Sequence, residues 1–146
     1  MITKKYKGVW FYGLAGSGKT VASQFLKKKI KNSLVLDGDK IRKYVSFDLG
    51  YTIKERKIQI KRVFGLVNLS IESKIFPIAS TVYMDGKTKQ KLRKKKIFLI
   101  NVIRNFKNIK NRKKIYNRKN YDVVGIDIKM PTIKNEFKIE NNSSIK

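Results

Sequence analysis

The chain contains no cysteine and no histidine among its 146 residues. The lack of cysteine excludes a disulfide framework and a thiolate metal site, and the lack of histidine excludes a zinc site built on imidazole and a Ser-His-Asp triad. Any catalysis by this chain must therefore rely on carboxylates, hydroxyls, lysines, arginines and a bound ion.

Acidic residues are also scarce, because 10 Asp and Glu stand against 36 Lys and Arg, for a formal net charge of +26. Such an excess ordinarily indicates a nucleic acid or an anionic membrane as partner. The lysines are spread through nearly every segment, however, together with many Ile and Asn. We therefore interpret them as solvated faces that also steer anionic substrates, and we do not expect a nucleic-acid partner.

Long apolar runs are missing as well. No window approaches the length of a membrane span, and residues 1–13 pass from a short basic run into a strand without the apolar region of a signal peptide. We expect a cytoplasmic protein without a membrane partner. The length fits one domain, which we assign to residues 1–140, with a disordered tail at 141–146.

Apolar patterns alternate between strands and helices along the chain. They predict strands within 7–16, 33–36, 74–83 and 96–102, and helices over 19–30, 54–73 and 86–95. The first helix should bury the apolar face formed by Val21, Ala22, Phe25, Leu26 and Ile30. Residues 120–131 fit either a last short strand or a loop. The alternation predicts an α/β fold with three layers, in which helices cover both faces of a mainly parallel sheet. The glycine-rich loop at residues 13–20, which follows the first strand, makes this fold the P-loop NTPase type.

Residues 13–20 read Gly-Leu-Ala-Gly-Ser-Gly-Lys-Thr and match the phosphate-loop pattern G-x-x-x-x-G-K-[ST] in full. The glycines let successive backbone N–H groups turn toward phosphates, and the N-terminus of the next helix adds a favourable dipole. We expect Lys19 to reach the β- and γ-phosphates of ATP and the Thr20 hydroxyl to bind Mg²⁺. The expected ATP-binding residues are Gly13, Ala15, Gly16, Ser17, Gly18, Lys19 and Thr20.

An acidic turn follows the second predicted strand. Asp37 and Asp39 should emerge at the carboxyl edge of the sheet, beside the phosphate loop. One carboxylate there can accept a proton from an alcohol or help to hold the ion, and Arg42 can bind an anionic acceptor. A solvated Asp-Gly turn without a function is the simpler alternative.

These residues resemble adenylylsulfate kinase, the small P-loop enzyme that phosphorylates the ribose 3′-hydroxyl of adenosine 5′-phosphosulfate. The matching stretches are GLAGSGKT, LDGDKIR, DLGYTIKERKIQIKRV and VVGID, which fall in the family's order across about residues 8–140. The resemblance implies that Lys19, Asp39 and, in support, Asp37 are catalytic. It also implies that Arg42 and Arg56 hold the anionic group of the acceptor, that Tyr51 stacks on its base, and that the protein is a homodimer.

Other positions depart from the family pattern. Gln59 stands where the family has an asparagine that contacts the acceptor, and Val123 replaces the phenylalanine that forms the second wall of the base clamp. Residues 80–86 also differ, and the basic lid expected at 107–119 lacks the family's Asp and Gly. The positions that hold phosphate persist, whereas the positions that read the acceptor have changed.

We therefore predict an ATP-dependent kinase that phosphorylates the ribose 3′-hydroxyl of a nucleotide conjugate, with Asp39, Arg42, Tyr51, Arg56, Gln59 and Val123 at the acceptor. The changed positions favour a divergent branch, cytidine diphosphoramidate kinase of capsule biosynthesis, because specificity comes from contacts with the base and with the group on its phosphate. The alternatives are an adenylylsulfate kinase that makes 3′-phosphoadenylylsulfate for sulfate assimilation, a nucleic-acid-binding protein with a relic loop, and a kinase-like protein that binds ATP without transferring phosphate.

Overall fold

A single parallel sheet forms the centre of the computed structural model, which describes residues 2–110, 122–131 and 136–142. Its 5 strands lie in the order β2-β3-β1-β4-β5, and every pairing among them is parallel. The strands are β1 (Gly8–Tyr12), β2 (Ser33–Asp37), β3 (Phe76–Thr81), β4 (Ile97–Ile103) and β5 (Lys138–Glu140). The helices are α1 (Ile2–Lys5), α2 (Lys19–Lys29), α3 (Gly38–Tyr44), α4 (Ile53–Glu72), α5 (Gly86–Lys94) and α6 (Phe106–Lys110).

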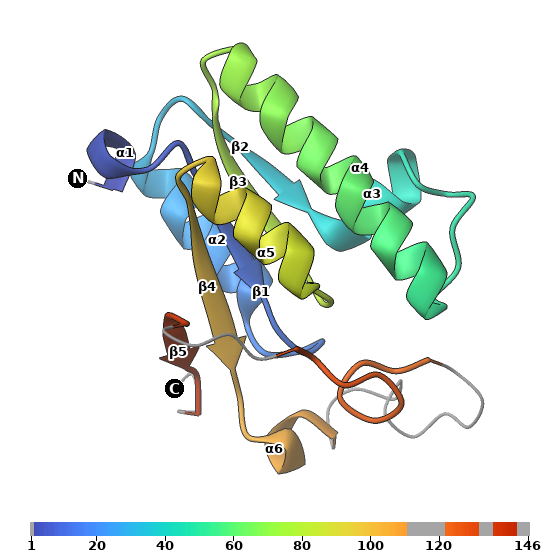
Figure 1. The fold of residues 1–146 in the computed structure, drawn as a ribbon. Helices are drawn as coiled ribbons and strands as arrows, with labels where there is room; N and C mark the ends of the chain where they lie inside the picture. The colour runs from blue at the N-terminus through green and yellow to red at the C-terminus, as the bar shows by residue number, and fades with distance from the viewer. Residues whose placement is uncertain (1, 111–121, 132–135, 143–146) are drawn as a thin grey trace.

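Helices cover both faces of this sheet, with α2 on one face and α4 and α5 on the other (Figure 1). Successive side chains of a strand point to opposite faces, and β1 shows the consequence. Val9 and Phe11 join the apolar cluster under α2, while Trp10 and Tyr12 join the cluster under α4 and α5. The predicted three-layer α/β fold is therefore confirmed.

Two details of the expected apolar pattern are wrong. Val21 and Phe25 of α2 are 62% and 63% exposed, while Ala22 and Leu26 pack against the sheet. Val21 and Phe25 line a cleft instead. Only the side of α2 that carries Ala22 and Leu26 faces the strands. Helical spacing alone could not distinguish a core from the wall of a cleft.

Of the short strand and the loop that the sequence allowed at 120–131, the described residues form the loop, and a strand that was not expected follows. Residues 122–131 form a loop with one isolated bridge between Val124 and Ile128, and β5 follows as an additional edge strand. Asn141 and Asn142, which we assigned to a disordered tail, make hydrogen bonds to the ends of the phosphate loop and of β4. Residues 143–146 of that tail lie outside the described residues.

Alanine substitutions at two glycines, one in a crowded position and one in an open position, test the backbone geometry. Gly13 has φ +141°, and a Cβ there would meet the Val102 carbonyl oxygen, so Gly13→Ala should lower the free energy of unfolding by about 1–3 kcal/mol. Gly65 lies inside α4, and a Cβ there would meet no atom outside its own helix backbone within 4 Å, so Gly65→Ala should raise the free energy of unfolding by about 0.5–1 kcal/mol. Urea denaturation measures both, and a stabilising Gly13→Ala variant would contradict the loop geometry.

Candidate active site

The loop between β1 and α2 borders a cleft of about 890 Å³ at the carboxyl edge of the sheet. Gly13, Gly16 and Gly18 have φ values of +141°, +84° and +106°, which only glycine adopts without strain. This backbone lets consecutive N–H groups gather around an anion. Ala15, Gly16 and Gly18 line the cleft, while Ser17 is fully buried behind them.

Lys19 and Thr20 begin α2 at the bottom of the cleft. The Lys19 side chain is 9% exposed, and its Nζ donates a hydrogen bond to the Leu14 carbonyl oxygen across the loop at 2.8 Å. The Thr20 hydroxyl donates to the Asp37 carboxylate at 3.2 Å. The sequence-predicted lysine and hydroxyl thus both line the same cleft as the glycine loop.

The two carboxylates of the acidic turn lie in different surroundings. Asp37 is 7% exposed and caps α3, because its carboxylate accepts hydrogen bonds from the Asp39 and Lys40 N–H groups at 3.0 and 3.3 Å. Its other oxygen accepts from Thr20 and, at 3.4 Å, from the Ser80 hydroxyl. Asp39 is exposed in the first turn of α3 and lines the cleft. Asp37 can therefore organise the site, and Asp39 is free to meet an acceptor hydroxyl.

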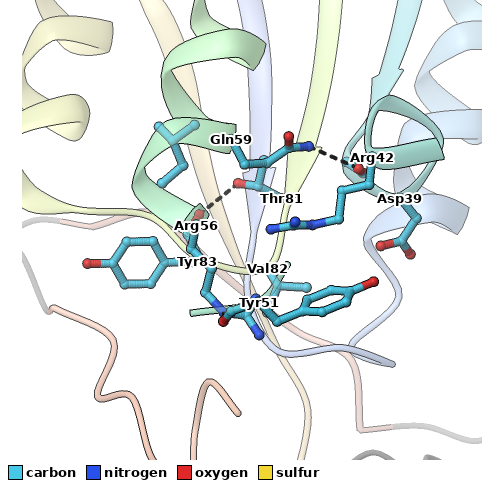
Figure 2. Close-up of a pocket in the computed structure, with 10 residues that line it drawn as sticks. Asp39, Arg42, Tyr51, Arg56, Gln59, Thr81, Val82 and Tyr83 are labelled. Carbon is cyan, nitrogen blue, oxygen red and sulfur yellow. Dashed lines mark hydrogen bonds between the residues drawn. The ribbon is translucent and has the colours of Figure 1, made fainter. Parts of the chain in front are cut away.

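A smaller cavity of about 50 Å³ adjoins the cleft, and Asp39, Tyr51 and Arg56 line both spaces. The guanidinium groups of Arg42 and Arg56 lie 4.5 and 5.4 Å from the centre of the Tyr51 ring. The ring itself is 48% exposed, and Figure 2 shows it at the mouth of the cavity with Arg42 above it. A ring exposed in this way can stack on a nucleotide base.

Backbone carbonyl groups fix the two arginines. Arg42 Nη1 donates to the Gly50 carbonyl oxygen at 2.5 Å, and burial lowers the pKa of Arg42 from its ordinary value. Arg56 Nε and Nη2 donate to the carbonyl oxygens of Tyr51 and Asp122 at 2.8 and 2.9 Å. Arg56 thus connects the loop that precedes α4 to the loop at 122–128.

Gln59 and Val123 occupy separate parts of the site. Gln59 is 4% exposed in the small cavity, where its Nε2 donates to the Gly38 carbonyl oxygen at 3.2 Å, and its Oε1 has no hydrogen-bond partner in the described part of the chain. Val123 is 3% exposed and packs with Ile109 and Leu14 against the phosphate loop. It lines the large cleft together with Tyr51.

Three residues of the site escaped the sequence reasoning. Ser80 reaches Asp37, Asn141 Nδ2 donates to the Ser17 carbonyl oxygen at 2.9 Å, and Arg104 lines the cleft. Arg104 directly follows β4, so its place after a predicted strand was an available signal. Asn141 carries no such signal. Of the lid expected at 107–119, residues 111–119 lie outside the described residues, and 107–110 belong to α6.

The donor set at the loop suits Mg²⁺ in the way typical of nucleotide sites. No group of three or more His, Cys, Asp or Glu that could hold a metal occurs within 2–110, 122–131 and 136–142. Mg²⁺ commonly takes only one or two protein ligands and completes its shell with phosphates and water, and the Thr20 hydroxyl beside Asp37 fits that pattern. None of the helices in the described ranges has the length and apolar character needed to cross a membrane.

A glycine phosphate loop at the carboxyl edge of a parallel sheet, together with an aspartate at the end of β2, the next strand along the chain, defines a nucleotide-binding protein of the P-loop class. The model of one family within this class, adenylylsulphate kinase, matches residues 5–130. The chain therefore belongs to the adenylylsulphate kinase family.

Individual relatives share part of the sequence. The adenylyl-sulfate kinase of Thermodesulfovibrio yellowstonii is 36% identical over 89 residues, which are 58% of this chain and 44% of the relative. The adenylyl-sulfate kinase of Buchnera aphidicola is 33% identical over 78 residues, 51% of this chain and 38% of the relative. The matched part of the chain thus spans less than half the length of these curated relatives.

Solved structures extend the likeness of fold to nearly the whole chain. The APS kinase CysC of Mycobacterium tuberculosis, in complex with AMPPNP and APS, has a TM-score of 0.83 and covers 96% of this chain and 91% of its own. Its sequence is 22% identical, so this match concerns the fold.

The two arginines of α4 offer a matched test of the site's framework. Arg56→Met removes a buried donor from two loop carbonyl groups and should lower the free energy of unfolding by about 1–3 kcal/mol. Arg62→Met breaks an ion pair with Asp48 that is open to solvent, so its effect should be much smaller. Thermal and urea denaturation compare them, and equal losses would contradict the anchoring role of Arg56.

Proposed function

We propose that the protein is an ATP-dependent phosphotransferase that transfers the γ-phosphoryl group of ATP to the ribose 3′-hydroxyl of adenosine 5′-phosphosulfate. One observation carries this proposal. The cleft that contains Lys19 and Thr20 also contains Asp39, Tyr51 and Arg56, so a nucleotide triphosphate and an anionic nucleotide acceptor can lie side by side.

In this proposal the chain's own residues act mainly by position and charge. Lys19 exchanges the Leu14 carbonyl oxygen for phosphate oxygens and neutralises the charge that develops on them. Asp39 orients the acceptor hydroxyl and accepts its proton, while Arg42 and Arg56 hold the anionic group on the acceptor's 5′ side. Thr20 holds Mg²⁺, which supplies further charge neutralisation on the transferring phosphate when bound.

The identity of the acceptor rests on the relatives. The named curated relatives are adenylyl-sulfate kinases, and they support the adenylylsulfate acceptor better than the cytidine diphosphoramidate that Gln59 and Val123 led us to expect. The residues found at positions Gln59 and Val123 differ from the family pattern, and this observation is the reason that cytidine diphosphoramidate, and with it capsule biosynthesis, is the second candidate. The homodimer expected from the family stays a prediction.

Lys19→Ala tests the reaction itself. Loss of the cation at the phosphates should lower kcat at least about 100-fold, because such groups act on charge that develops in the transition state. A coupled ATP-consumption assay with Mg²⁺ and adenosine 5′-phosphosulfate measures it, and Lys28→Ala, an exposed lysine of the same helix, is the control. Turnover of the folded Lys19→Ala variant at the wild-type rate would refute the assignment.

Competition between the two candidate acceptors tests which of them is the substrate. We expect a higher kcat/KM for adenosine 5′-phosphosulfate than for cytidine diphosphoramidate when both are offered with ATP. The opposite preference would move the protein to the cytidine branch. No turnover of either compound, together with steeply salt-dependent binding to RNA or DNA, would favour a nucleic-acid-binding protein instead.

Replacing Tyr51 should change the KM for the acceptor and leave the KM for ATP unchanged. Tyr51→Ala removes the exposed ring and should raise the KM for the acceptor about tenfold, since stacking of a base on an aromatic ring contributes roughly 1–3 kcal/mol. Tyr51→Phe keeps the ring and should stay close to wild type. If both variants raise the KM equally, the hydroxyl and not the ring reads the acceptor.

A further inference from the structure

A buried ion pair lies beside the phosphate loop but outside the reacting groups. Lys89 of α5 and Glu136 have side chains that are 1% and 4% exposed, and Lys89 Nζ lies 2.7 Å from Glu136 Oε1. The same Nζ donates to the Pro131 carbonyl oxygen at 2.9 Å and lies 4.5 Å from the centre of the Tyr12 ring. Burial lowers the pKa of Lys89 to about 8, so the lysine stays mostly charged at neutral pH.

Such a pair adds little to stability, because removing two charges from water costs about as much as their attraction returns. Its geometry indicates a different role. Glu136 Oε2 accepts a hydrogen bond from Asn101 Nδ2 of β4 at 3.1 Å, and the Asn101 N–H donates to the Phe137 carbonyl oxygen at 2.9 Å. The pair therefore fixes the start of the segment 136–142 to β4 and α5.

The segment 136–142, which contains β5, is mostly exposed, although the Phe137 ring lies 5.1 Å from the Phe98 ring. All three residues of β5 are exposed, and even Ile139 is 39% exposed. Polar contacts at the far end complete its attachment. The Asn141 N–H donates to the Ile103 carbonyl oxygen at 2.7 Å, and Asn142 Oδ1 accepts from the Asn105 N–H at 2.7 Å.

The side chain of Asn141 lines the cleft and contacts the phosphate loop. Its Nδ2 donates to the Ser17 carbonyl oxygen at 2.9 Å and lies against Gly18. The Ser17 carbonyl and the Gly18 N–H belong to one planar trans peptide and point in opposite directions. Holding this carbonyl therefore fixes the direction of the Gly18 N–H, one of the donors available to a bound phosphate.

We propose that Asn141 is a positioning residue for the phosphate loop, and that the Lys89–Glu136 ion pair places it there by fastening the segment 136–142 to β4. This inference rests on the proposed function to the extent that the loop must bind ATP. It assigns to the C-terminal segment a part in nucleotide affinity, although no atom of Asn141 needs to touch the reacting groups.

Direct binding of a non-hydrolysable ATP analogue with Mg²⁺ tests the role of Asn141 without turnover. Asn141→Ala should weaken binding about tenfold, and Asn141→Asp should weaken it further, because a carboxylate there would face the Ser17 carbonyl oxygen. Lys138→Ala, which changes an exposed residue of β5, is the control and should bind like wild type. The KM for the acceptor should not change in any of the three.

The ion pair is tested by the double variant Lys89→Met with Glu136→Gln, which leaves no lone buried charge. Its affinity for the ATP analogue should fall as in Asn141→Ala. Hydrogen exchange of the Asn101 and Asn141 amides, which both donate across the β4–β5 junction, should become faster while the amides of β1 stay protected.

The outcomes separate the two proposals. A wild-type protein that does not bind the ATP analogue overturns the proposed function. A wild-type protein that binds, together with Asn141→Ala and Asn141→Asp variants that bind equally well, overturns the role of Asn141 alone. Wild-type affinity or unchanged amide exchange in the folded double variant overturns the role of the ion pair. If the double variant does not fold, the same two measurements on Glu136→Gln alone decide it.

Discussion

The Asp37 carboxylate connects the elements of this molecule whose positions relative to one another must stay fixed. It ends β2, caps α3 through the Asp39 and Lys40 N–H groups, and accepts the hydroxyl hydrogens of Thr20 and Ser80. A nearly buried carboxylate needs such partners, because an unsatisfied charge away from water is costly. The start of α2, the end of β3 and the start of α3 are therefore held at fixed distances, and the phosphate loop and the carboxylate of Asp39 face the same cleft as a result.

The two halves of that cleft differ in how they recognise a ligand. The phosphate side relies on backbone N–H groups, a glycine-dependent conformation and one lysine, and a short sequence motif specifies all of these. The acceptor side relies on side chains that loops position, such as Arg42 on the Gly50 carbonyl and Arg56 on the Tyr51 and Asp122 carbonyls. Under the proposed function, differences at Gln59 and Val123 can therefore change which acceptor binds while the phosphate loop stays the same.

The segment 136–142 shows that support for a site can come from residues without any motif. Glu136 is bound to α5 and β4 inside the protein, and Asn141, five residues later, donates a hydrogen bond to the Ser17 carbonyl oxygen of the phosphate loop. Neither residue type in that context marks a function by itself. Their combined effect is to brace a loop whose glycines make it intrinsically adaptable, since glycine restricts the backbone less than any other residue.

Local sequence alone determined the phosphate loop, the alternation of strands and helices with the three-layer fold, and the acidic turn at Asp37 and Asp39, because each depends on neighbours within a few residues. Only the tertiary structure decided which apolar residues are buried, as the exposed Val21 and Phe25 of α2 show. It also decided the pairing of Lys89 with Glu136, which are 47 positions apart, and the contact of Asn141 with Ser17, which are 124 apart. Such contacts depend on where the sheet places distant segments, and no local pattern of residues encodes that placement.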